Sequence, residues 1–295
     1  MLEVREVVKA YGTNVAVKQL SFQLKRGDLL GLVGSNGSGK TTTFRMILGL
    51  LQPDQGQILL DQQPVQLADR RLFGYLPEER SLYRELTVRR QLHFLGQLKG
   101  MESKAIETAT QHWSTILELQ DFLHASIKTL SKGNQQKVQF MSCLLHDPQI
   151  CIVDEPFSGL DPYNLELMKR VFLELKQKGK MVLLSTHRLD HIESFCSQVI
   201  VLKKGEAVLQ GEISKLRQES IIRYLRVQGN LQYHQLQMME EITRIQKEGK
   251  GYRLQFDNEE NAKKIMRQLL KKQDLLQLSY EFPTLLDLFM AQGGV

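Results

Sequence analysis

Residues 29–42 read Leu29-Leu30-Gly31-Leu32-Val33-Gly34-Ser35-Asn36-Gly37-Ser38-Gly39-Lys40-Thr41-Thr42. The first five predict a short buried strand, and the remainder fits the pattern G-x-x-x-x-G-K-[ST]. Glycines let such a loop wrap so that successive backbone N–H groups point inward, and the helix that follows adds the positive end of its dipole. The stretch therefore predicts a strand, a phosphate-binding loop and a helix.

Two side chains of this loop carry the chemistry that a nucleoside triphosphate needs. Lys40 would place a positive charge between the β- and γ-phosphates, and the Thr41 hydroxyl would coordinate Mg²⁺. A glycine-rich loop can match by chance, but the strand before it and the helix after it argue against chance. The residues expected to bind the nucleotide here are Gly34, Ser35, Asn36, Gly37, Ser38, Gly39, Lys40, Thr41 and Thr42.

Strand-like and helix-like segments alternate on both sides of the loop. Short apolar runs stand at 29–33, 150–153, 181–185 and 199–202, and helical spacing marks 41–50, 88–99, 104–119 and 163–178. This alternation predicts an α/β domain around a largely parallel sheet. Short alternating runs that contain Phe22, Leu24, Ile58 and Leu60 predict flanking antiparallel strands, and residues 88–147 predict a helical insertion.

The composition changes after Gly211. Residues 214–220 are polar and charged, as in a connector, and the following segments alternate between strand-like and helical patterns up to residue 289. We expect a large domain over residues 1–218 and a small α/β domain over residues 219–295.

The composition limits the setting. Hydrophobic residues make up 42% and charged residues 24% of the 295, as in ordinary globular proteins. No apolar run is long enough for a membrane span, and residues 1–4 lack the pattern of a secretory signal. Cys143, Cys151 and Cys196 are scattered, which favours buried thiols in a reducing cytoplasm. The net charge of +6 is too diffuse to predict nucleic-acid binding.

A second acidic motif follows the apolar run at 150–153. Asp154 at the strand end could hold Mg²⁺, and Glu155 could act as a general base toward a water in line with the γ-phosphate. Two acids at a strand end are, taken alone, equally compatible with simple solvation. Their place downstream of a phosphate loop favours catalysis.

Residues 130–136, Leu130-Ser131-Lys132-Gly133-Asn134-Gln135-Gln136, define the class. They resemble the Leu-Ser-Gly-Gly-Gln signature of the ATP-binding cassette family, matching at Ser131 and Gly133 and departing at Lys132 and Asn134. Taken alone, the motif is a polar helix cap that offers an anion site. In this family it faces the γ-phosphate held by the opposite subunit. The resemblance therefore implies two subunits enclosing two ATP molecules, and the intact Glu155 favours a homodimer.

Other positions match the family in the expected order. Tyr11 stands where an aromatic ring contacts adenine, His187 matches the switch histidine at the γ-phosphate, and Asp161 matches the turn that couples the two sites. Glu78 replaces the usual glutamine that touches Mg²⁺ and the attacking water. Its carboxylate can still coordinate a hard cation, although its charge alters the metal site.

The resemblance extends to function. Residues 80–100 correspond to the part of the family that meets a polytopic membrane permease, which would hold this chain at the inner face of the cell membrane. Residues 74–80 and 283–289 look like those of bacterial sodium- and drug-efflux ATPases. The family implies hydrolysis of ATP to ADP and phosphate with Mg²⁺, coupled to export.

Two alternatives stay open at this point. A non-transport member of the superfamily would act on ribosomes or nucleic acid, but such members usually carry two cassettes or long coiled-coil insertions. A small-molecule kinase would use the phosphate loop but would leave Ser131, Gly133 and His187 unexplained.

Overall fold

The computed structural model describes residues 1–79, 81–271 and 275–292, so Arg80 of the expected permease segment lies outside the described residues. The chain divides into two compact units, Met1–Gln210 and Gly211–Val295. This division precedes the expected boundary at residue 218, because helix α7 (Ile213–Glu219) belongs to the second unit. There, Arg217 Nε donates to the Pro283 carbonyl at 3.0 Å.

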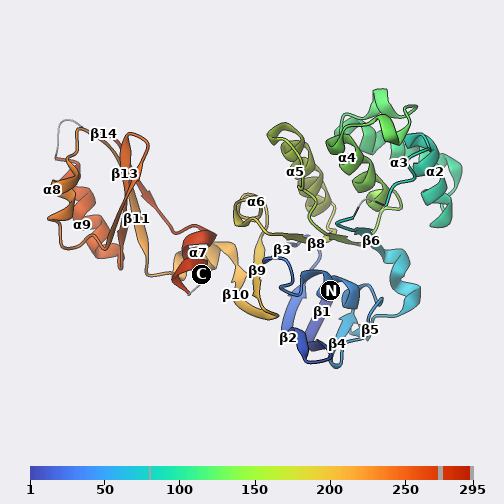
Figure 1. Ribbon diagram of the computed structural model, residues 1–295, viewed down its shortest axis with the longest axis horizontal. Helices are drawn as coiled ribbons and strands as arrows, with labels where there is room; N and C mark the ends of the chain where they lie inside the picture. The colour runs from blue at the N-terminus through green and yellow to red at the C-terminus, as the bar shows by residue number, and fades with distance from the viewer. Residues whose placement is uncertain (80, 272–274, 293–295) are drawn as a thin grey trace. The chain divides into compact units, whose positions relative to one another are not determined.

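A six-stranded sheet forms the centre of the first unit (Figure 1), in the order β10-β9-β3-β8-β7-β6. Its strands are β3 (Leu29–Val33), β6 (Phe73–Leu76), β7 (Ile150–Val153), β8 (Met181–Thr186), β9 (Gln198–Lys203) and β10 (Glu206–Glu212). Strand β3 pairs in parallel with β8 and β9, and β7 pairs in parallel with β6 and β8. The largely parallel sheet is confirmed, and it brings the carboxyl ends of β3, β7 and β8 to one edge.

An antiparallel sheet packs beneath this centre in the order β2-β1-β4-β5. Its strands are β1 (Leu2–Tyr11), β2 (Asn14–Leu24), β4 (Gln55–Leu60) and β5 (Gln63–Pro64). Phe22, Leu24, Ile58 and Leu60 are buried, as the alternation predicted, and share one core with the inner residues of the central sheet. Because both sheets contribute to that core, β3 and its loop are fixed from two sides.

Helices cover the remaining surfaces of the first unit. They are α1 (Lys40–Ile47), α2 (Val88–Leu98), α3 (Ser103–Ile116), α4 (Lys132–Leu144), α5 (Pro162–Gln177) and α6 (Leu189–Glu193), with 3₁₀ turns at Leu67–Leu72, Gln120–Phe122 and Ile127–Thr129. The predicted helical insertion is confirmed as α2 to α4. Over the described ranges of the chain, no helix combines the length and the apolar character that crossing a membrane requires.

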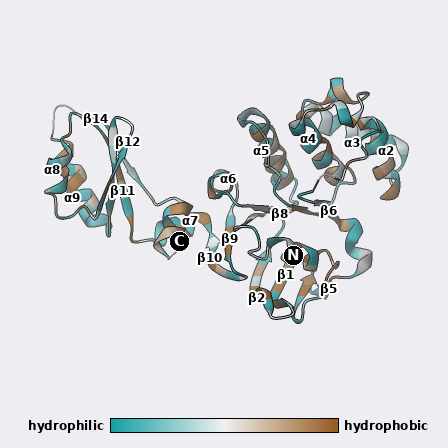
Figure 2. Cartoon of the chain, viewed as in Figure 1, coloured by the Kyte–Doolittle hydropathy of each residue, from teal (hydrophilic) through white to brown (hydrophobic). Residues whose placement is uncertain are grey.

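The second unit has the order β-α-β-β-α-β of a split βαβ motif. Its elements are β11 (Arg223–Gly229), α8 (Tyr233–Gln237), β12 (Arg244–Glu248), β13 (Gly251–Phe256), α9 (Glu259–Leu269) and β14 (Leu275–Glu281), followed by α10 (Leu285–Ala291). The sheet order is β12-β13-β11-β14. Ala262, Ile265 and Leu269 of α9 pack on Leu225 and Leu254 of the sheet, and Figure 2 shows hydrophobic and hydrophilic residues alternating around α9.

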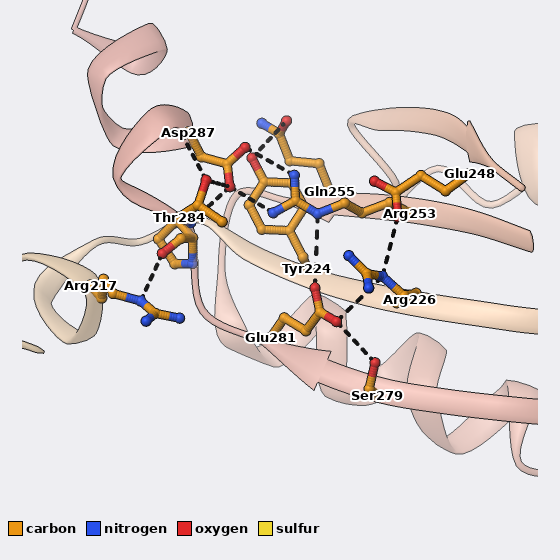
Figure 3. Close-up of polar contacts among 11 residues, drawn as sticks. Arg217, Tyr224, Arg226, Glu248, Arg253, Gln255, Ser279, Glu281, Thr284 and Asp287 are labelled. Carbon is orange, nitrogen blue, oxygen red and sulfur yellow. Dashed lines mark hydrogen bonds and ion pairs between the residues drawn. The ribbon is translucent and has the colours of Figure 1, made fainter. Parts of the chain in front are cut away.

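A network of ion pairs ties α10 to this sheet (Figure 3). Arg253 of β13 donates two hydrogen bonds to the Asp287 carboxylate, at 2.9 and 2.6 Å. Its guanidinium carbon lies 3.6 Å from the centre of the Tyr224 ring. Thr284 and Asp287 form the capping box at the start of α10. One carboxylate therefore both caps the last helix and neutralises a buried arginine.

The Asp287 carboxyl makes the stability of this unit depend on pH. Burial opposes its ionised form, but hydrogen bonds from Arg253 and Thr284 outweigh burial and lower the pKa from 3.8 to about 2. The contribution is complete above the pKa of the unfolded chain and is lost as the pH falls toward 2.

We predict that Asp287→Asn lowers the free energy of unfolding of the second unit by about 2 kcal/mol at pH 7, because a hydrogen-bonded charge is removed. Urea unfolding monitored at pH 7 and pH 3 should show a smaller gap to the parent protein at the acidic pH. Asp257→Asn, which changes an exposed acid, is the matched control. Equal unfolding midpoints for Asp287→Asn and the parent at pH 7 would show that the network does not stabilise the unit.

Candidate active site

The phosphate loop connects β3 to α1, and at Gly34 and Gly39 the surrounding atoms leave no room for a side chain. Gly39 has φ 107°, and a Cβ there would lie 2.4 Å from the Ala16 carbonyl oxygen. A Cβ on Gly34 would lie 2.4 Å from Ser38 Oγ and 2.5 Å from the Leu202 carbonyl oxygen. The loop can close this tightly only without side chains at both positions.

Lys40, the first residue of α1, is held inside the loop. Its side chain is 6% exposed, and Nζ donates to the carbonyl oxygens of Gly34 and Ser35 at 2.7 and 3.2 Å. The nearest carboxylate oxygen, Glu155 Oε1, is 4.0 Å away. A buried ammonium with one distant carboxylate fits an additional anionic group.

A cavity of about 300 Å³ opens in front of the loop. Tyr11, Asn14, Ala16, residues 36–42 and Glu78 line it, so the structure brings together three separate segments that the sequence singled out. Ser38 Oγ is buried there without a hydrogen-bond partner among the described residues. A cavity lined by loop residues and an unpaired hydroxyl suits phosphate oxygens.

Asp154 follows β7 and faces the loop. Its side chain is almost fully buried, and Oδ2 accepts a hydrogen bond from Thr41 Oγ1 at 3.1 Å. The hydroxyl of Ser185 in β8 donates to Oδ1. A carboxylate beside a hydroxyl offers the oxygen ligands that Mg²⁺ prefers, and these residues fit that metal.

Glu155 lies between the loop and His187. Its backbone has φ 48°, a left-handed conformation that residues other than glycine rarely adopt. Glu155 Oε2 is 3.1 Å from His187 Nδ1, whereas Oε1 is buried without a hydrogen-bond partner in the described part of the chain. Both residues line a second cavity of about 680 Å³, so Glu155 lies between the phosphate loop and this second cavity.

Three expected site residues lie apart from the loop cavity. Ser131 caps α4 and accepts a hydrogen bond from Asn134 N at 3.2 Å, and Asp161 caps α5 in the same way. Hydrogen bonds from the Asn164 backbone and side chain lower the pKa of the Asp161 carboxyl. A Cβ on Gly133 would lie 3.6 Å from Leu160 Cδ2, so the signature segment and the turn before α5 are neighbours. None of the three residues lines the loop cavity.

Sequence reasoning assigned no role to Ser185, Asn14 or Ala16. Asn14 and Ala16 line the cavity from a strand that showed only an alternating pattern. Ser185 contacts both acids, and a hydroxyl two residues before His187 was the only signal in the sequence.

Known proteins are similar to this chain in sequence and in fold. A profile of the ABC transporter family matches residues 17–158. The ABC transporter ATP-binding protein YhaQ of Bacillus subtilis is 38% identical over 100% of this chain and 99% of its own length. The Nod factor export ATP-binding protein I of Sinorhizobium fredii is 34% identical over 75% of this chain and 65% of its own. A solved ATP-binding subunit of an ABC transporter is 32% identical, with a TM-score of 0.68 over 74% of this chain and 92% of that one.

The loop, the acid pair and the central sheet define a phosphate-loop ATPase cassette. The chain belongs to the family of ABC transporter ATP-binding subunits, which bind and hydrolyse ATP.

Proposed function

We propose that ATP is hydrolysed at the loop cavity with Glu155 as the general base, and that the reaction drives a separate membrane permease. The observation that carries this proposal is the position of the Glu155 carboxylate. It is buried, one of its oxygens is unpaired, and it lies 4.0 Å from the lysine of the phosphate loop. An acceptor in this position can take a proton from a water that attacks the γ-phosphate.

The other residues would bind and orient the nucleotide. Tyr11 stacks on adenine at the mouth of the cavity, and Lys40 leaves the loop carbonyls to bridge the β- and γ-phosphates. Thr41, Asp154 and Glu78 would hold Mg²⁺, which supplies charge that stabilises the phosphoryl transition state. The second Glu78 oxygen replaces an amide and makes this metal site more negative than one built with glutamine.

His187 would hold Glu155 in position and contact the γ-phosphate. Its Nδ1 faces Glu155 Oε2, which leaves Oε1 directed to the water. The proton that water loses passes to Glu155 while the bond from the γ-phosphorus to the leaving oxygen breaks, giving ADP and phosphate.

A second copy of the chain would complete the site. Ser131 and Gly133 lie at the start of α4, where backbone N–H groups and a hydroxyl can bind an anion, yet they do not line their own loop cavity. In a dimer, Ser131 and Gly133 would face the γ-phosphate bound by the partner, and Asp161 would lie at the contact between the two sites.

We predict that Glu155→Gln lowers the turnover of ATP by about 10²–10⁴-fold, because the amide cannot accept the proton. ATP and Mg²⁺ binding should persist, because Lys40, Thr41 and Asp154 are unchanged. The variant should therefore accumulate as an ATP-bound dimer in light scattering, and ADP should leave it monomeric.

The control for that dimer is a second substitution, Ser131→Arg, which should dissociate it by crowding the γ-phosphate pocket of the partner. Parental turnover in Glu155→Gln would rule out Glu155 as the base. An inactive variant that stays monomeric in saturating ATP would rule out a homodimer.

The permease would dock on the helical side of the first unit. Tyr83 and Phe94 form an exposed edge-to-face pair with ring centres 5.6 Å apart. A groove of about 210 Å³ in the same unit is lined by Leu50 and Phe73, and also by the cationic side chains of Arg70 and Lys99. Exposed aromatic and leucine side chains beside a groove suit the end of a membrane subunit.

We infer export as the direction, since a relative is named for Nod factor export. Docking on the permease would place the chain at the cytoplasmic face of the membrane. Every residue of the loop cavity belongs to Met1–Gln210, so the second unit would tune dimerisation or coupling instead of chemistry.

We predict that Leu50→Glu abolishes co-purification with a polytopic membrane protein from detergent-solubilised membranes, because it replaces an exposed apolar side chain of the groove with a carboxylate. The ATPase activity of the isolated chain should not change. Leu173→Glu, on the exposed side of α5, is the matched control and should retain the partner. Equal recovery of that membrane protein with both variants would exclude the groove as the docking site.

A further inference from the structure

We infer that Ser185 is a positioning residue that sets both the metal ligand Asp154 and the base Glu155; this inference rests on the proposed function of those acids. Ser185 is fully buried in β8. The parallel register pairs Val153 with Leu184, so Ser185 is level with Asp154, the first residue beyond β7. Its side chain thus meets the acid pair where the pair leaves the sheet.

The hydroxyl of Ser185 both donates and accepts a hydrogen bond. It donates to Asp154 Oδ1 and accepts from the backbone N–H of Glu155 at 3.0 Å. A hydroxyl has one hydrogen to donate and two lone pairs, so one atom can orient the side chain of one acid and the backbone of the next. The hydroxyl of Thr186, its neighbour in β8, accepts a local hydrogen bond from Arg188 N instead.

The bond to the Glu155 N–H supports an uncommon backbone conformation. Glu155 has φ 48°, and this conformation directs its carboxylate toward His187 and Lys40. Without the acceptor, a buried N–H would lose its partner, and the residue would relax toward negative φ. Relaxation would turn the carboxylate away from Lys40 and His187.

The bond to Asp154 acts on the metal site. Thr41 Oγ1 holds one carboxylate oxygen at 3.1 Å, and Ser185 holds the other. Partners that orient a metal ligand typically change metal affinity by about 10- to 100-fold when they are removed. Loss of the Ser185 hydroxyl should therefore lower the affinity for Mg²⁺. It should not change the contacts that Lys40 makes with phosphates.

The test compares Ser185→Ala with the parent protein in turnover and in ATP binding with and without Mg²⁺. Turnover should fall about 10- to 100-fold, the loss typical of removing a partner that orients a ligand, and less than the loss expected for Glu155→Gln. ATP affinity measured by calorimetry without metal should be unchanged, whereas the gain in affinity on adding Mg²⁺ should shrink. Ser185→Cys, which keeps the size but is a weak hydrogen-bonding group, should behave likewise if the alanine variant does not fold.

A double variant separates positioning from general damage. In saturating Mg²⁺, Glu155→Gln combined with Ser185→Ala should be little slower than Glu155→Gln alone, because the effect through the metal ligand is then suppressed and both substitutions disable the same base. Ser114→Ala is the matched control, since Ser114 is equally buried but its hydroxyl donates to the nearby Gln111 carbonyl and not to an acid of the site. It should keep parental turnover and parental dependence on Mg²⁺.

The outcomes distinguish this inference from the proposed function. Parental turnover in Glu155→Gln would refute the function of the site. An inactive Glu155→Gln beside folded Ser185→Ala and Ser185→Cys variants with parental turnover would refute only the role of Ser185. Equal loss of ATP affinity with and without Mg²⁺ would also refute it, because that pattern indicates damage to the loop.

Discussion

The structure depends on a buried lysine and two buried carboxylates that follow neighbouring strands of the central sheet. Lys40 Nζ lies 4.0 Å from Glu155 Oε1, and the Asp154 carboxylate is hydrogen-bonded to Thr41 and Ser185. Removing such charges from water is costly unless each is neutralised and hydrogen-bonded. Here the loop carbonyls hold the ammonium, and Glu155 Oε1 has no hydrogen-bond partner among the described residues, so the chain itself compensates these buried charges only in part.

The fold explains how these groups meet. Strands β3, β7 and β8 are neighbours in a parallel sheet, and the loop, the acid pair and His187 each follow one of them at its carboxyl end. That edge is where open α/β sheets bind ligands. The core that the central sheet shares with the antiparallel sheet leaves these strands little freedom. The positions of the site residues are therefore set more by the sheet than by the loops that carry these residues.

The sequence was informative wherever a segment was buried on all sides or carried a spaced motif. The bounds of Leu29–Val33 and Ile150–Val153 follow from their uninterrupted apolar runs. Cross-strand contacts leave no such pattern: Ser185 looks like any strand residue, and Arg253 and Asp287 are 34 positions apart. The polar composition of α7 suggested a connector. The helix is instead held by the hydrogen bond from Arg217 to the Pro283 carbonyl, and a partner so far along the chain cannot be recognised from the local sequence.

We propose that each chain contributes to two ATP sites, because Ser131, Gly133 and Asp161 line neither the loop cavity nor the cavity beside Glu155 and His187. The most direct measurement is phosphate release per subunit as a function of protein concentration in excess ATP and Mg²⁺. The account predicts a rate per subunit that rises with concentration and levels off as dimers form. A rate per subunit that stays constant while sedimentation shows only monomers would contradict it.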